Sequence, residues 1–219
     1  MPANAVLFDL DGTLVDTAPD MAAALNRVVR EEGFSALPAE NIRPHVSRGG
    51  LALTRLAFGG RFTDETRIEA LRQRFLQYYL EDIAQHSRLF EGFEDLLNRL
   101  EQARIAWGIV TNKPAWLTDP LVAQLKLNER SAVTISGDTT AERKPHPLPL
   151  ITAAETIGLP CDQCIYVGDD PRDIEAGKAA RMTTVVARWG YIDEDSDPDQ
   201  WQADFQVDQP GDLSHLVFA

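Results

Sequence analysis

The sequence Ala5-Val6-Leu7-Phe8 runs directly into Asp9-Leu10-Asp11-Gly12-Thr13-Leu14-Val15-Asp16-Thr17, and this stretch decides the fold. Its first four residues form a continuous apolar run that is too short for a helix. The run therefore predicts a strand buried on both faces of a parallel sheet. Asp9 and Asp11 follow it, and Gly12 lets the chain turn. Ligands of open α/β sheets bind at the carboxyl ends of strands, so this segment also predicts where the site lies.

Further apolar runs of the same kind follow later in the chain. They predict strands at residues 105–110, 133–136, 165–167 and 183–187, and a short sixth strand at 205–207. Helical periodicity separates these runs, at 93–100, 117–125 and 150–157. Asp170-Pro171 is typical of an N-cap followed by proline at the first helical position. From residue 89 onward, strands and helices alternate, which predicts an α/β fold with a doubly wound, Rossmann-like parallel sheet.

Residues 16–88 break this alternation. One amphipathic helix is predicted around Met21, Leu25 and Val28 and is stopped by Gly33, and a second runs from Ile68 to beyond Tyr79. The stretch 44–50 between them is interpreted as a loop, and no strand is predicted in the region. The sequence therefore predicts an all-helical domain at 16–88, inserted into an α/β core formed by residues 1–15 and 89–219.

Polar residues follow four of the predicted strands. They are Asp9 and Asp11, Thr111 and Asn112, Lys144, and Asp169 with Asp173. Carboxylates brought that close repel each other, and buried charges without partners are costly. Mg²⁺ resolves this conflict because it prefers oxygen ligands, usually one or two carboxylates with waters and substrate phosphate. The sequence therefore predicts a Mg²⁺ site for a phosphorylated substrate at this edge of the sheet.

These residue types suit phosphoryl transfer. Asp9 can attack phosphorus as a nucleophile, and Asp11 can protonate the leaving alkoxide and later activate water. Lys144 and Mg²⁺ offset charge on the phosphoryl oxygens, which Thr111 can also bind. Each residue alone also has a structural explanation, such as a helix cap for Asp170 beside Asp169 or a solvated position for Lys144. The hypothesis rests on their combined order and placement.

The four segments resemble the four motifs of the haloacid dehalogenase superfamily. The first is 9–17, the second Val110-Thr111-Asn112-Lys113-Pro114, the third Arg143-Lys144-Pro145, and the fourth Val167-Gly168-Asp169-Asp170-Pro171-Arg172-Asp173. They occur in the family's order over essentially the whole chain. The helical insert is similar to the type 1 cap of the phosphoglycolate phosphatase and β-phosphoglucomutase branch, and the resemblance implies cap motion with hinges near Asp16-Thr17 and Ser87-Arg88.

The resemblance also implies a role for each residue. Asp9 is the implied nucleophile and Asp11 the acid/base, with hydrolysis through a phospho-aspartate. Thr111, Asn112 and Lys144 are implied to bind the phosphate group. The implied metal ligands are Asp9, Asp11 through its backbone carbonyl, Asp169, and Asp173 either directly or through water. An acid at position 11 indicates phosphoryl transfer, because carbon–halogen cleavage needs no protonated leaving group.

The substrate is less strongly indicated. Within the cap loop 43–50, Ser47, Arg48 and Gly49 are the candidate specificity residues, and Arg48 can bind a carboxylate or a sugar oxygen. The alternative for Arg48 is a solvent-exposed position without a ligand. His45 is a further candidate to face the site, and a structural role is its alternative. Residues 188–192 and 201–204 resemble the N-acetylmuramic acid 6-phosphate phosphatases of peptidoglycan recycling. Phosphoglycolate or another small phosphomonoester remains an alternative substrate, and a sugar phosphomutase remains an alternative enzyme.

Composition excludes other classes of function. The chain has 219 residues, with 21 Lys and Arg against 34 Asp and Glu, and a formal net charge of −13. Nucleic acids and anionic membranes are negatively charged and bind basic surfaces, so neither is expected as a partner of this acidic chain.

Cys161 and Cys164 have the C-x-x-C spacing but open a strand, and they are interpreted as reduced thiols. With no signal peptide or membrane span evident, we expect a cytoplasmic enzyme, and a monomer by default for this branch.

Overall fold

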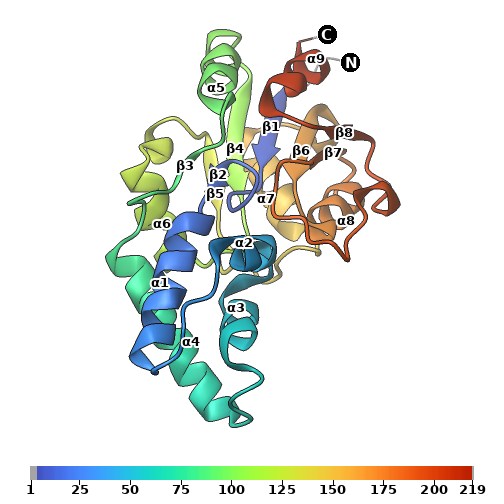
Figure 1. Ribbon diagram of the computed structural model, residues 1–219. Coiled ribbons are helices and arrows are strands. Elements are labelled where there is room, and N and C mark those ends of the chain that lie inside the picture. Colours follow the sequence, from blue (N-terminus) through green and yellow to red (C-terminus); the bar gives the residue numbers. More distant parts are fainter. Residues whose placement is uncertain (1–3, 219) are drawn as a thin grey trace.

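A six-stranded sheet lies at the centre of the computed structural model, which describes residues 4–218 (Figure 1). Its order is β5-β4-β1-β6-β7-β8, and all five neighbouring pairs are parallel. The strands are β1 (Ala5–Phe8), β4 (Ala106–Val110), β5 (Val133–Ile135), β6 (Cys164–Gly168), β7 (Thr183–Ala187) and β8 (Phe205–Val207). These are the six strands predicted from the apolar runs. The strand that precedes Asp9 is therefore central, with β4 and β6 on its two sides.

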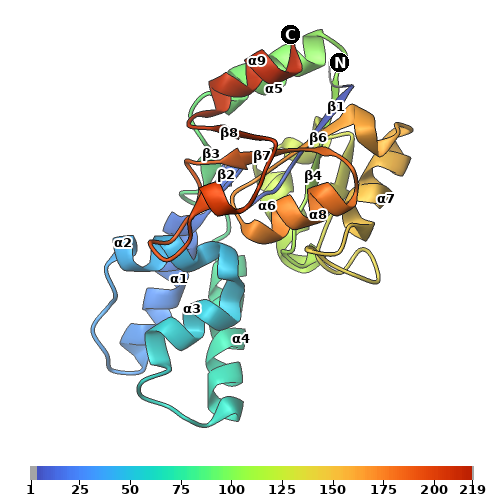
Figure 2. The ribbon, with the colours of Figure 1, turned by 90° about the vertical axis from the view of Figure 1, so that its right-hand side faces the viewer.

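Helices cover both faces of this sheet. They are α5 (Phe93–Gln102), α6 (Ala115–Gln124), α7 (Leu148–Ile157), α8 (Pro171–Ala179) and α9 (Leu213–Val217). Alternate residues of β1 point to opposite faces: Val6 and Phe8 pack with α5, α6 and α9, whereas Ala5 and Leu7 pack with α7 and α8. Figure 2 shows α5 and α9 lying together and α7 and α8 on another side of the sheet. The predicted doubly wound fold is confirmed.

The inserted segment is helical. Its helices are α1 (Ala18–Glu31), α2 (Ala39–Ile42), α3 (Gly49–Phe58) and α4 (Glu65–Glu81), and they extend away from the sheet as a separate layer (Figure 2). The long helices α1 and α4 pack together through buried side chains that include Leu25, Val28, Leu71 and Phe75. Both were predicted from their apolar spacing.

The prediction of a loop at 44–50 is wrong. Residues Arg43–Arg48 form a 3-10 helix, and α3 begins at Gly49. The Gly49-Gly50 pair indicated a turn, and Gly49 does have a positive φ of 83°. Helix α3 nevertheless forms because Leu53 and Phe58 are buried in the core shared with α4. Tertiary packing thus overrides a local helix-breaking signal.

The prediction that 16–88 contains no strand is also wrong. β2 (Val15–Asp16) pairs antiparallel with β3 (Arg88–Leu89), so the two connections between sheet and insert form a short ribbon. Two-residue strands carry too little alternation to be visible in a sequence. We propose this ribbon as the boundary between the core and a cap domain, in place of sharp boundaries after residues 15 and 88.

A buried carboxylate ties the two connections together just beyond the ribbon. Asp20 lies in the first turn of α1, and its side chain accepts hydrogen bonds from the backbone N–H groups of His86 at 2.9 Å and Ser87 at 2.8 Å. The Ser87 hydroxyl also donates to it, at 2.6 Å. The start and the end of the insert are therefore fixed to each other.

Within residues 4–218, none of the helices has the length and apolar character needed to cross a membrane.

Asp20→Ala should destabilise the protein markedly. The substitution leaves the buried backbone N–H and hydroxyl of Ser87 and the partly buried N–H of His86 without an acceptor, and a buried group of this kind costs about 1–3 kcal/mol. We expect the free energy of unfolding in urea to fall by about 3 kcal/mol. Asp20→Asn, which keeps one acceptor oxygen, should lose less than half as much. A change for Asp20→Ala below about 0.5 kcal/mol, as at an ordinary surface site, would contradict this assignment.

Candidate active site

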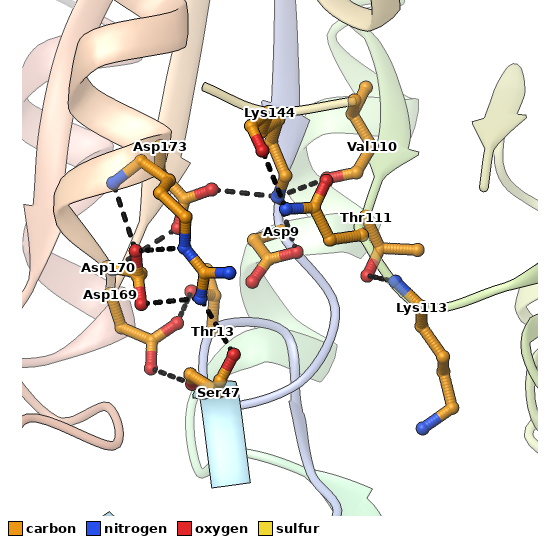
Figure 3. A network of polar contacts seen from close by, with 12 residues as sticks. Asp9, Thr13, Ser47, Val110, Thr111, Lys113, Lys144, Asp169, Asp170 and Asp173 are labelled. Atoms are coloured by element: carbon orange, nitrogen blue, oxygen red, sulfur yellow. Dashed lines mark hydrogen bonds and ion pairs between the residues drawn. The ribbon is translucent and has the colours of Figure 1, made fainter. Parts of the chain in front are cut away.

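The polar residues predicted from the strand ends meet at the carboxyl edge of the sheet (Figure 3). Asp9 follows β1, Thr111 follows β4 and Asp169 follows β6, so the three lie on adjacent strands. The backbone N–H of Asp9 donates to the carbonyl of Val167 at 2.9 Å, which extends the ladder between β1 and β6 by one residue. The central position of β1 therefore places Asp9 between the other motifs.

Three carboxylates form a buried cluster. One oxygen from each of Asp9, Asp169 and Asp173 lies within 4.8 Å of the others, and the residues are 7%, 2% and 1% exposed. The cluster fits closely against the backbone of the first motif. A Cβ on Gly12 would lie 2.3 Å from Oδ2 of Asp169, and Gly12 has a φ of 87°. Glycine is therefore required at position 12 for both space and conformation.

Lys144 supplies the positive charge in this cluster. Its Nζ lies 2.8 Å from Oδ1 of Asp9 and 2.7 Å from Oδ1 of Asp173, and it also donates to the hydroxyl of Tyr166 and the carbonyl of Val110. Burial alone would lower the pKa of Lys144, but the carboxylates of Asp173 and Asp9 outweigh it and raise that pKa. The ammonium is therefore charged and faces two of the three acids.

Asp169 has no comparable cation. Within residues 4–218 no lysine or arginine pairs with it, and it accepts hydrogen bonds from the hydroxyl of Thr13 (2.8 Å), the backbone of Tyr191 (2.8 Å) and the hydroxyl of Ser47 (3.1 Å). Burial, together with the charges of Asp9 and Asp173, raises the pKa of Asp169 well above its usual range. Three buried acids facing one ammonium, with oxygen donors close together, fit a hard divalent cation.

Asp11 points away from this cluster. Its Oδ1 accepts hydrogen bonds from Nζ of Lys113 at 3.0 Å and from the hydroxyl of Thr17 at 2.7 Å. Its side chain is therefore not among the clustered carboxylates. The metal contact implied for its backbone carbonyl stays a prediction. Lys113 belongs to the second motif, but nothing in the sequence indicates that it pairs with Asp11.

Thr111 and Asn112 occupy different positions in the site. The Thr111 hydroxyl accepts from the backbone N–H of Lys113 at 3.1 Å, so its own proton can be donated to a ligand. The amide nitrogen of Asn112 donates to the backbone carbonyl of Lys144 at 2.9 Å, and its Oδ1 is buried without a partner in the described chain. Asn112 therefore holds the Lys144 segment in place, whereas Thr111 faces the site.

The cap reaches the site through the short segment 47–49. Ser47 bonds to Asp169 through its hydroxyl, and its carbonyl accepts from Arg172 at 2.8 Å. Arg48 pairs with Asp193 of the core, and Gly49 begins α3. All three line the cavity described next, whereas His45 is not among its lining residues.

A cavity of about 620 Å³ lies between the cap and the sheet edge. The core contributes Asp9, Asp11, Thr111 and Lys144 to its wall, and the cap contributes residues 47–51 and, from α4, Glu69, Arg72 and Leu76. The α4 residues were not predicted as site residues. Their spacing of three and four places them on one helix face, but nothing in the sequence indicated that this face borders the site.

Two tyrosines support the site and were also missed. The Tyr166 hydroxyl accepts from Lys144 at 2.8 Å, and the Tyr191 hydroxyl accepts from the backbone of Thr17 at 2.7 Å and donates to Asp16 at 2.8 Å. Tyr166 lies in a strand that was interpreted as simple core. Tyr191 lies in residues 188–192, which indicate a subfamily but no contact with the site. Neither contact can be read from spacing, because each spans more than 20 residues of sequence.

The comparisons with known proteins agree with this geometry. A family model described as haloacid dehalogenase-like hydrolase matches residues 6–187. A phosphoglycolate phosphatase of Xanthomonas campestris pv. campestris is 51% identical over 210 residues, covering 96% of this chain and 94% of its own. An N-acetylmuramic acid 6-phosphate phosphatase of Pseudomonas putida is 43% identical over 217 residues, covering 99% and 97%.

A solved structure from Haemophilus somnus, described as a predicted phosphoglycolate phosphatase, superimposes with a TM-score of 0.87 at 25% identity and covers 98% of both chains. These names confirm the prediction of a phosphoric monoester hydrolase. The order of the four motifs, the doubly wound sheet and the match over 6–187 lead to the same assignment. The chain belongs to the haloacid dehalogenase-like hydrolase family.

Proposed function

We propose that the protein is a Mg²⁺-dependent phosphatase that hydrolyses a small phosphomonoester through a phosphorylated Asp9. The observation that carries the proposal is the position of Asp9 between Lys144 and Asp169, at the base of a cavity that the cap covers. Oδ1 of Asp9 is bonded to Lys144, which leaves Oδ2 to attack phosphorus (Figure 3). Lys144 thus both orients the nucleophile and offsets charge beside it.

The two steps use Asp9 and Asp11. In the first, an oxygen of Asp9 forms a bond to phosphorus, the bond to the leaving oxygen breaks, and Asp11 gives that oxygen a proton. In the second, Asp11 takes a proton from water, the water oxygen bonds to phosphorus, and the Asp9–phosphorus bond breaks to release inorganic phosphate. Thr111 and Lys144 bind the phosphoryl oxygens, with Asn112 holding the Lys144 segment.

The proposed metal ligands are Asp9, Asp169 and the backbone carbonyl of Asp11. Asp173 already has a cation, since Nζ of Lys144 lies 2.7 Å from its Oδ1, whereas no lysine or arginine of the described chain pairs with Asp169. We therefore propose that Asp173 acts through water. When bound, Mg²⁺ supplies positive charge for the phosphoryl oxygens.

N-acetylmuramic acid 6-phosphate is the substrate we propose, with phosphoglycolate as the alternative. A cavity of about 620 Å³ lies in the range of about 300–1,000 Å³ that holds drug-sized ligands, so it has room for an amino sugar. Both compounds carry a carboxylate in addition to the phosphate. Arg48 and Arg72 are cations in the cavity wall, and they pair with Asp193 and Glu69 respectively. We propose that a substrate carboxylate takes the place of one of these acids. Ser47 and Gly49 shape the same wall.

Other features of the proposal follow from composition. We propose no nucleic-acid or membrane partner for the enzyme, because its net charge of −13 opposes binding to either. A cytoplasmic location and a monomer are also part of the proposal, the monomer as the default for this branch of the family. The described chain contains free thiols at Cys161 and Cys164, as a reducing compartment favours. A sugar phosphomutase shares the phospho-aspartate chemistry and is the rival class.

Asp9→Asn should abolish phosphate release, because an amide is not a competent nucleophile. With purified protein, Mg²⁺ and N-acetylmuramic acid 6-phosphate, we expect release to fall by at least about 10⁴-fold in a phosphate assay. The circular dichroism spectrum should match that of the wild type. Turnover retained within about tenfold would contradict the proposed mechanism. Conversion of the sugar phosphate by the wild type without phosphate release would indicate a mutase.

A panel of phosphomonoesters ranked by kcat/KM tests the substrate. Discrimination between substrates is measured by the ratio of their kcat/KM values. We expect kcat/KM for the amino-sugar substrate to exceed that for phosphoglycolate by at least about tenfold. Arg48→Met should reduce kcat/KM for carboxylated substrates more than for glucose 6-phosphate, which has no carboxylate. Arg55→Met, which alters an exposed arginine of α3 that does not line the cavity, is the control. A preference for phosphoglycolate, or equal losses on all substrates, would overturn this assignment.

A further inference from the structure

Lys113 joins the acid/base candidate to the cap. It follows β4 in the core, and its buried Nζ lies 3.0 Å from Oδ1 of Asp11. The same Nζ donates to the hydroxyl of Tyr79 at 3.1 Å and lies 4.5 Å from the centre of that ring. Tyr79 is fully buried and belongs to α4 of the cap. One ammonium group therefore bridges the sheet edge and the inserted helices.

The bridge leaves one oxygen of Asp11 available. Lys113 and Thr17 both donate to Oδ1, whereas Oδ2 has no hydrogen-bond partner in the part of the chain the structure describes. Asp11 also lines the cavity that holds Asp9 and Lys144. A carboxylate with one oxygen doubly held has little freedom to rotate, so its other oxygen is kept in a fixed direction.

Tyr79 suits the role of an anchor for Lys113. Burial raises the pKa of Tyr79 to about 12, despite the opposing charge of Lys113, so the phenol is neutral and its oxygen accepts from the ammonium. Burial would lower the pKa of Lys113, but Asp11 and Tyr79 outweigh it and the pKa is raised. Both polar groups of the bridge are therefore satisfied.

We propose that Lys113, anchored by Tyr79 of the cap, is a positioning residue that holds Asp11 so that Oδ2 exchanges the proton with the leaving group. This proposal rests on the proposed function. It differs from the phosphate-binding role proposed for Lys144, because it assigns the ammonium of Lys113 to Asp11 and Tyr79. It also makes the placement of Asp11 depend on the cap, since Tyr79 is carried by α4.

Two substrates separate positioning from a merely structural role. The p-nitrophenolate group leaves without a proton, whereas an alkoxide needs one from Asp11. Because kcat/KM covers only the steps up to departure of the leaving group, the later water step does not enter it. The experiment therefore measures kcat/KM for p-nitrophenyl phosphate and for phosphoglycolate or N-acetylmuramic acid 6-phosphate, whichever the wild type hydrolyses faster.

Lys113→Met should lower kcat/KM for the alkyl substrate by about 10²-fold and for p-nitrophenyl phosphate by less than about threefold. Tyr79→Phe should show a smaller loss with the same dependence on the leaving group. Asp11→Asn is the positive control for this pattern. Tyr78→Phe is the matched control, because it removes the hydroxyl of the preceding residue of α4, which donates to Glu31 at the surface. It should change neither value.

The outcomes distinguish the proposal from the function on which it rests. Equal losses on both substrates in Lys113→Met and Tyr79→Phe, or no loss in either, would overturn the positioning role while the phosphatase stands. A wild type that releases phosphate from none of these substrates would overturn the proposed function itself. If Lys113→Met does not fold, Tyr79→Phe alone decides by the same comparison.

Discussion

Repulsion among buried carboxylates is the constraint on which this site depends. Asp9, Asp169 and Asp173 approach within 4.8 Å of one another, and Lys144 neutralises only part of their charge. Buried like charges raise each other's pKa and destabilise the fold unless a cation joins them. The fold nevertheless keeps them there, because β1 and β6 are adjacent central strands and α8, which carries Asp173 in its first turn, follows β6. The fold thus maintains a local excess of negative charge that suits a metal ion, and through it a phosphate.

The cap completes the site from the other side. Ser47 bonds to Asp169, and Tyr79 reaches Lys113, so cap residues contact both the carboxylate cluster and the support of Asp11. The ribbon of β2 and β3 and the buried Asp20 join the two connections between the layers. The segment proposed to select the substrate is therefore connected to the residues proposed to carry out the chemistry.

Much of this arrangement could be predicted from the sequence, and the remainder has a physical explanation. Apolar runs that end in polar residues predicted the strands and located Asp9 and Lys144, because both signals are local. Helix α3 and the β2–β3 ribbon were missed, since packing rather than propensity forms them. The bonds of Lys113 and Tyr166 were missed because they join residues distant in sequence, whose meeting depends on the strand order.

Binding of Mg²⁺ in the absence of substrate tests the central claim most directly. Mg²⁺ at about 100 times its Kd should stabilise the wild type by about 2.7 kcal/mol and raise its melting temperature by several degrees. Asp169→Asn, which removes one of the repelling charges, should melt no lower than the wild type without metal and should gain little from Mg²⁺. An unchanged wild-type melting temperature, or an equal rise in Asp169→Asn, would contradict a metal site built from these carboxylates.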